Sequence, residues 1–176
     1  MNDVDKLLAY EEIRQLASRY AVYSDARDMG KLVDLYIPDV RVGRDTYGRD
    51  ALLEDFDKAF RDVGVTFLQV GNHVIDFVVD DDDRATGIVY CRGEIQDGGI
   101  QSERWIVHAI QYHDTYERRD GHWFFARRKH FLVYGAELGV NPLGLEPANW
   151  PASQTGMGSH PHVLETWQQF WAKTSG

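Results

Sequence analysis

Four strand-like segments separated by very short turns fill the middle of this 176-residue chain and constrain its fold more than any other feature. β-branched and apolar residues are enriched in these segments, as is usual for strands. The expected strands are residues 67–79, 85–95, 102–118 and 123–133. The three turns that join successive segments are Asp80-Asp81-Asp82-Asp83, Asp97-Gly98-Gly99 and Asp120-Gly121. Because connections this short join neighbouring antiparallel strands, the sequence predicts an antiparallel meander.

The segment before residue 66 has helical periodicity instead. Apolar residues at positions 13, 16, 17, 20 and 21 follow the spacing of one helix face, so the first predicted helix buries a stripe that includes Tyr20. We expect a second helix over 31–36 after the cap Asp28, and a third that begins at the cap Asp50 and ends at Gly64. Residues 40–47 are expected to form a short strand. Helices followed by a meander predict an α+β fold.

The C-terminal part of the chain has a different character. Residues 135–162 show no periodicity and are rich in Gly and Pro, so we expect a long loop there. A closing helix over 163–173 places Trp167 and Phe170 on one apolar stripe, which must dock on the sheet or on another subunit. We therefore expect a domain over residues 1–135 and a C-terminal extension over 136–176, packed on the same domain or on a partner subunit.

Composition excludes several classes of partner. The formal net charge of -9 argues against broad attraction to nucleic acid or to an anionic membrane. With Cys91 as the single cysteine, the chain has no internal disulfide and no thiolate pair for a metal. No stretch approaches the ~20 apolar residues of a membrane span, and the first residues lack an apolar signal core. We expect a cytoplasmic protein, and no nucleotide cofactor, because the glycines lack the spacing of a phosphate-binding loop.

Tyr20 and Asp25 place a phenol and a carboxylate at the rim of the first helix's apolar face. A carboxylate held against apolar walls has a raised pKa and becomes a usable proton acceptor. The alternative interpretation is structural. In that case Asp25 or Asp28 caps the next helix, and Tyr20 is a core aromatic whose hydroxyl has a hydrogen-bond partner.

Four parts of the sequence carry a resemblance to a known family. They are Glu12-Ile13-Arg14-Gln15-Leu16 with Tyr20 and Asp25, Gly30-Lys31-Leu32-Val33-Asp34-Leu35-Tyr36, Asp114-Thr115-Tyr116-Glu117-Arg118-Arg119-Asp120-Gly121-His122-Trp123, and Arg128. Over roughly residues 5–135, the chain resembles the SnoaL-like branch of the nuclear transport factor 2 superfamily. The resemblance implies a cone-shaped α+β barrel, in which the N-terminal helices pack on a curved, mostly antiparallel sheet and enclose an apolar pocket. Because this fold hosts many chemistries, it indicates activity less strongly than fold.

The resemblance also implies a set of site residues and no cofactor. In the branch with bile-acid and scytalone dehydratases and a dehydrochlorinase, the pocket carries an Asp and sometimes a Tyr on the first helix. A strand His serves as the base, and an Arg lies on the last long strand. By motif position Tyr20, Asp25 and Arg128 match these residues, whereas the family's His falls on Leu68.

Other histidines are candidates to replace the missing one. Strand alternation places His130 on the same face as Arg128, and His108 joins them with Tyr112 if the pleats of the two strands are in step. His73 points to the opposite face in a regular strand, although a bulge at Gly71 would reverse that. The strand histidines also leave a metal site open as an alternative, but they lack closely spaced ligand pairs, so we expect no metal.

These residues indicate a lyase that abstracts a proton from a hydrophobic, ring-bearing substrate. Asp25 would act directly or through His108 or His130, Tyr20 would donate a hydrogen bond, and Arg128 would stabilise developing negative charge. The expected substrate-binding residues are Leu68, Trp105, Tyr112 and Leu132. Elimination of water and retro-aldol cleavage both remain open. The alternatives are a double-bond isomerase and a non-catalytic protein that binds an apolar ligand. We also expect a homodimer or homotrimer.

Overall fold

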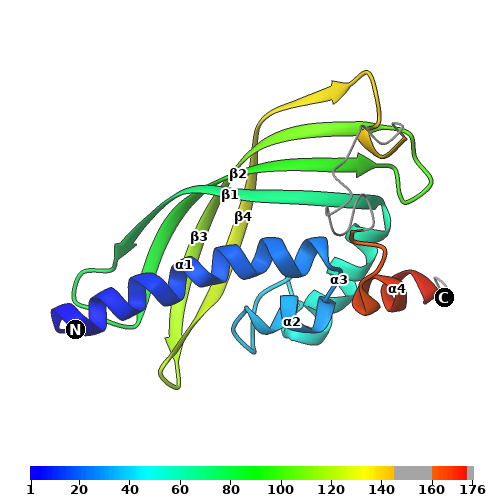
Figure 1. The fold of residues 1–176 in the computed structure, drawn as a ribbon. Coiled ribbons are helices and arrows are strands. Elements are labelled where there is room, and N and C mark those ends of the chain that lie inside the picture. Colours follow the sequence, from blue (N-terminus) through cyan, green and yellow to red (C-terminus); the bar gives the residue numbers. More distant parts are fainter. Residues whose placement is uncertain (145–159, 174–176) are drawn as a thin grey trace.

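The computed structural model describes residues 1–144 and 160–173. Within these residues, helices are followed by one curved antiparallel sheet of strand order β1-β2-β3-β4, which confirms the predicted α+β fold and its meander (Figure 1). The helices are α1 (Asp3–Asp25), α2 (Met29–Asp34), α3 (Arg49–Arg61) and α4 (Glu165–Ala172), with a 3-10 turn over Pro142–Gly144. The strands are β1 (Val63–Phe77), β2 (Arg84–Asp97), β3 (Trp105–Arg119) and β4 (His122–Leu138).

Helix α1 lies along the concave face of the sheet, with α2 and α3 packed near its C-terminal end (Figure 1). Its buried residues Ile13, Leu16 and Ala17 come from the predicted apolar stripe. Asp28 caps α2 as expected, because its side chain accepts a hydrogen bond from the Lys31 backbone N–H at 3.3 Å. None of the helices in the described part of the chain is long and apolar enough to cross a membrane.

Two local predictions before the sheet were wrong. Helix α3 begins after Gly48, whose φ of 99° suits only glycine, and not at Asp50. It ends at Arg61, so Gly64 lies inside β1. Residues 40–47 form a tight loop with a single bridge between Arg41 and Tyr47 instead of a strand, because the backbone N–H groups of residues 42 and 43 both turn onto the Thr46 carbonyl.

Strand β4 is longer than predicted and contains two bulges. It continues to Leu138, past the expected end at Val133. Its register with β3 shifts at Ala126 and again at Val133, where each extra residue is left unpaired. Residues 131–138 are all exposed, so this half of β4 extends beyond the core. The bulges matter for the site because each one changes which residues of β4 face the concave side.

The main core lies between the helices and the sheet. Ile13, Leu32, Val40, Tyr116 and Phe125 are each at most 2% exposed there. Burial of a side chain of this size contributes about 1.5–3 kcal/mol, so this cluster fixes the helices against the strands. A smaller cluster under α1 contains the following buried residues: Ala17, Val89, Cys91, Ile110 and Tyr112. Together, the clusters determine where Tyr20 and Asp25, near the end of α1, meet the sheet.

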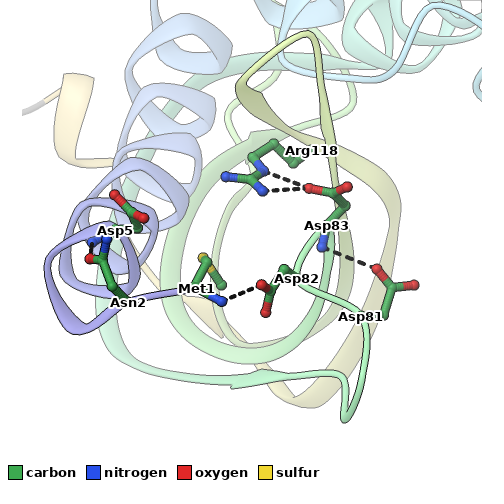
Figure 2. Close-up of polar contacts among 7 residues, drawn as sticks. All are labelled: Met1, Asn2, Asp5, Asp81, Asp82, Asp83 and Arg118. Carbon is green, nitrogen blue, oxygen red and sulfur yellow. Dashed lines mark hydrogen bonds and ion pairs between the residues drawn. The ribbon is translucent and has the colours of Figure 1, made fainter.

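The opposite end of α1 is anchored to the turn between β1 and β2 (Figure 2). Asp82 of this turn contacts the amino group of Met1, and Asp83 accepts a hydrogen bond of 2.7 Å from Arg118 of β3. The backbone N–H of Asp83 donates to the Asp81 carboxylate at 3.1 Å. These acidic residues therefore hold a turn in place through local contacts.

Candidate active site

The Asp25 carboxylate lies at the last residue of α1 and faces the start of β1. Its Oδ1 accepts a hydrogen bond of 2.7 Å from the Thr66 hydroxyl, and its Oδ2 accepts one of 3.0 Å from the Leu68 backbone N–H. Burial raises the pKa of Asp25 to about 6 even though these two donors and the charge of Arg27 favour the ionised form. Asp25 is therefore ionised near pH 7 and basic enough to accept a proton.

Arg27 places a buried positive charge behind Asp25 without forming a direct ion pair. Its Nη1 donates to the Thr66 hydroxyl at 3.2 Å, and because that hydroxyl has a single proton, Thr66 passes a hydrogen bond on to Asp25. The guanidinium also lies 4.6 Å from the Phe60 ring centre and 4.9 Å from that of Trp167. Burial lowers the pKa of Arg27 to about 10, so it stays charged at neutral pH. The Arg27–Thr66 contact fixes the orientation of the carboxylate.

Arg128 lies in an aromatic box and forms a buried ion pair. Its guanidinium carbon is 4.3–4.4 Å from the ring centres of Tyr20, Tyr112 and Phe125. Its Nε and Nη2 donate to the two oxygens of Asp114 at 2.9 and 2.7 Å. Burial alone would lower the pKa of Arg128, but its bonds to Asp114 raise it, so the group is permanently charged. The pair is neutral as a unit and buried, with 4% of the Arg128 side chain and 0% of the Asp114 side chain exposed.

Among the described residues, no hydrogen bond or ion pair joins Asp25 directly to Arg128. Leu68, whose backbone N–H binds Asp25, aligns through β2 with His108 of β3. The register partner of Arg128 is Asp114, six residues further along β3. The sequence reasoning missed Asp114, although its position two residues after Tyr112 on β3 was the available signal.

The two candidate histidines lie on the same face as Tyr112. His130 is the register partner of Tyr112, with ring centres 5.6 Å apart. Burial, and then the neighbouring His108, lower the pKa of His130, so its imidazole is mostly neutral near pH 7. Within residues 1–144 and 160–173, no imidazole is hydrogen-bonded to Asp25. Its carboxylate accepts from the Thr66 hydroxyl and the Leu68 backbone N–H instead.

His73 turns to the inner face because β1 has a register shift between Val70 and His73, around Gly71. Its Nε2 lies 3.0 Å from the Tyr116 hydroxyl, which donates to Asp114 at 2.9 Å. Tyr116 has only one proton to give, so Nε2 of His73 must be the donor in their contact. Burial lowers the pKa of His73 to about 4, which agrees with a neutral ring. His73 thereby joins β1 to the Asp114–Arg128 pair.

Gly87 of β2 makes the contact between Tyr116 and His73 possible. A Cβ at this position would lie 2.9 Å from Cε2 of Tyr116 and 2.9 Å from the Val74 carbonyl oxygen. Both distances are shorter than real Cβ contacts, so the Tyr116 ring occupies space that only glycine leaves free.

The expected substrate-binding residues are not all brought together. Leu68 and Tyr112 pack in the small cluster under α1. Leu132 of β4 is 51% exposed and is the register partner of Ile110 of β3. Trp105 is placed elsewhere, because it is 4% exposed and packs with Val65 and Trp167. Trp105 is thus separated from the cluster of Leu68 and Tyr112, although Trp167 of its own cluster contacts Arg27.

Comparison with known proteins places this geometry in a family. A sequence profile described as the SnoaL-like domain matches residues 5–129. The chain belongs to the SnoaL-like family. It is 29% identical over 143 residues to the gamma-hexachlorocyclohexane dehydrochlorinase of Sphingobium indicum, a match that covers 78% of this chain and 89% of that protein.

Solved structures agree with the SnoaL-like fold. A type 2 hexachlorocyclohexane dehydrochlorinase superposes with a TM-score of 0.69 at 23% identity, covering 87% of this chain and all of that one. A scytalone dehydratase candidate from Novosphingobium aromaticivorans gives 0.64 at 22% identity, covering 84% and 100%. These likenesses confirm the cone-shaped fold that the family resemblance implied.

The described residues of this SnoaL-like protein contain no group of three or more side chains able to hold a metal ion. The polar groups at the site divide into two sets. Asp25, Thr66 and Arg27 form one at the end of α1, and Asp114 with Arg128 forms the other at the inner face of β3 and β4. Helix α1 links the two sets, because it carries Asp25 of the first set and its Tyr20 contacts Arg128 of the second.

Proposed function

We propose that this SnoaL-like protein is a cofactor-independent lyase that abstracts a proton from a hydrophobic, ring-bearing small molecule. The observation that carries the proposal is the partly buried Asp25 carboxylate, whose pKa is raised to about 6. Each of its oxygens accepts one hydrogen bond from the described protein groups, which leaves lone pairs to take a proton. Asp25 replaces the His–Asp pair as the base, because Leu68 occupies the position of the family's His.

The proposed reaction is an elimination. Asp25 takes a proton from a substrate carbon and becomes a carboxylic acid, while the C–H electron pair forms the new double bond. The leaving group departs from the neighbouring carbon with its own electron pair, as hydroxide or halide. Burial raises the pKa of Tyr20, so its phenol remains a neutral hydrogen-bond donor for that group.

The remaining candidates have supporting roles in this proposal. Arg128 supplies positive potential through the Tyr20 ring, at a strength reduced by its pairing with Asp114. His130, with its lowered pKa, is a neutral acceptor opposite Tyr112, and His108 is near enough to lower that pKa. Double-bond isomerisation begins with the same transfer of a proton from carbon. Retro-aldol cleavage begins instead with transfer of the hydroxyl proton of a β-hydroxycarbonyl compound, and Asp25 would accept that proton as well.

A non-catalytic binding protein is the second candidate function. Leu68 favours it, because an apolar side chain stands where the family's base is expected and packs in the cluster of Ala17 and Cys91. With Leu68 in place of the base, the protein would bind an apolar ligand without changing it.

Proton abstraction is testable before the natural substrate is known. We would incubate the protein in heavy water with cyclic halides and with aromatic and steroid-like alcohols, and follow products and deuterium incorporation by NMR. The wild-type protein should transform at least one compound, and Asp25→Asn should reduce that rate by about 10²–10⁴-fold, as expected for loss of a general base. Asp62→Asn, an exposed carboxylate at the end of α3, is the matched control and should retain the rate. Full activity in Asp25→Asn would exclude Asp25 as the base.

A further inference from the structure

Helix α4 is tied at both ends to the elements around the C-terminal end of α1 (Figure 1). At its start, the Thr166 hydroxyl donates to the Ala26 carbonyl at 2.8 Å. At its other end, Arg61 of α3 donates to the backbone carbonyls of Phe170 and Lys173 at 3.3 and 3.0 Å. Helix α4 therefore has a defined position next to the part of α1 that carries the proposed base.

The side chain that α4 covers is Arg27, which is 2% exposed. Its guanidinium carbon is 4.9 Å from the ring centre of Trp167 and 6.0 Å from that of Phe170, both on α4. The two aromatic residues are themselves 3% and 4% exposed. Because an aromatic face attracts a cation more strongly when water is excluded, α4 helps to keep this charge in its buried position.

The hydrogen bonds of the same guanidinium go to the end of α1 and the start of β1. Its Nη1 donates to the Ser24 carbonyl and to the Thr66 hydroxyl, and its Nη2 donates to the carbonyls of Val63 and Gly64. The Nε group of Arg27 is buried without a hydrogen-bond partner among the described residues. The guanidinium thus lies in contact with α4 while it binds Thr66, the residue that donates to the Asp25 carboxylate.

The backbone of Arg27 supports a role for its side chain. Its φ of 55° lies in the left-handed region, and the N–H groups of Arg27 and Asp28 donate to the carbonyls of Ser24 and Tyr23 at 3.1 and 2.9 Å. This is the C-terminal helix cap in which glycine is usual, because other residues are strained there. A glycine would end α1 with less strain, so the end of the helix does not explain an arginine. Strained residues of this kind cluster at functional sites.

We propose that α4 is a positioning element of the active site, which holds Arg27 where it orients Asp25 through Thr66. This role rests on the proposed function, in which Asp25 takes the proton. Helix α4 lies beyond residues 5–129, so the SnoaL-like profile does not account for it. Without the Trp167 ring, water would reach the guanidinium, screen its charge and loosen its contact with Thr66.

The first test is a titration that needs no substrate. The carboxyl ¹³C shift of Asp25, followed against pH, should show a pKa about one unit higher in Arg27→Met, because a nearby positive charge lowers the pKa of a carboxyl group. Arg27→Lys keeps the charge and should stay closer to wild type. Arg44→Met removes an exposed arginine and is the matched control. An unchanged titration in Arg27→Met would overturn the proposal.

The second test concerns α4 itself. The Nε hydrogen of Arg27 is protected by burial alone, so its exchange with water, followed by ¹⁵N NMR, reports how well α4 covers it. Exchange should be faster in Trp167→Leu and closer to wild type in Trp167→Phe, which keeps an aromatic face. Trp123→Leu removes an indole that is equally buried, at 3% exposed, and packs against Phe77 instead. Wild-type exchange in Trp167→Leu, or equal acceleration in Trp123→Leu, would contradict this role of α4.

The third test separates positioning from basicity. At about pH 9 Asp25 is ionised in every variant, so a lower rate there reports geometry. With the cyclic halide or alcohol that the wild-type protein transforms fastest, Trp167→Leu and Arg27→Met should lower kcat about tenfold and leave KM near wild type. Wild-type kcat in Trp167→Leu would overturn the proposal. Full activity in Asp25→Asn would instead remove the proposed function, while the titration and the exchange would still show whether α4 holds Arg27.

Discussion

Asp114 of β3 and Arg128 of β4 are register partners joined by two parallel hydrogen bonds of 2.9 and 2.7 Å inside the cone. Tyr116 donates a third bond to the same carboxylate, so Oδ2 of Asp114 accepts from both Arg128 and Tyr116. A buried ion pair of this kind is sensitive to loss of one partner, because the remaining charge then stays in a medium that solvates it poorly.

Removal of Asp114 alone should therefore be strongly destabilising. Asp114→Asn should lower the free energy of unfolding by about 3–5 kcal/mol, because Arg128 would keep a buried charge without a counter-ion. The double variant Asp114→Leu with Arg128→Met should be more stable than Asp114→Asn, since it removes both charges. Urea unfolding of the variants measures these differences. A double variant less stable than Asp114→Asn would contradict this account of the pair.

Thr66 should tune the basicity of Asp25. Its hydroxyl donates to the ionised carboxylate and helps lower a pKa that burial raises to about 6. Thr66→Val should raise the pKa of Asp25 further, and Thr66→Ser should keep it near the wild-type value because the donor is retained. The carboxyl ¹³C shift of Asp25, followed against pH, reports this directly. The proposed reaction should speed up as the pH rises through about 6, with this midpoint moved upward only in Thr66→Val. Identical titrations in all three proteins would rule out the hydrogen bond as a cause.

Asp25 should also make stability depend on pH. Its pKa in the folded protein, about 6, is above the ordinary value of 3.8, so the folded state binds the proton more tightly than the unfolded state does. The resulting stabilisation is fully present below pH 3.8 and is lost as the pH rises through about 6. Asp25→Asn cannot ionise, so relative to wild type it should gain about 1–2 kcal/mol between pH 4 and pH 7.5, after allowance for partial solvent screening. Thermal unfolding at both pH values tests this, and a constant difference would argue against a raised pKa.

The sequence predicted the elements that follow from periodicity along one segment. The apolar stripe of α1, the Asp28 cap of α2 and the order of the four strands all depend on neighbouring residues, and all are present in the structure. The resemblance to the SnoaL-like family added the curvature of the sheet.

Features that depend on pairing between strands were harder to predict. The shift at Gly71 decides which way His73 points, and the bulge at Ala126 sets which residue of β4 lies opposite Asp114. Neither shift is visible in the alternation of one strand. The same limitation explains why Asp114, on the adjacent strand, was not predicted as the partner of Arg128.

Gly87 has a consequence that reaches beyond its own strand. The hydrogen atom in place of its side chain gives Tyr116 room to extend over β2, and through that ring His73 of β1 is linked to Arg128 of β4. One added methyl group at position 87 would thus disturb a guanidinium two strands away, in a region it does not touch. Surveys of variation that consider only cavity-lining positions would overlook this residue.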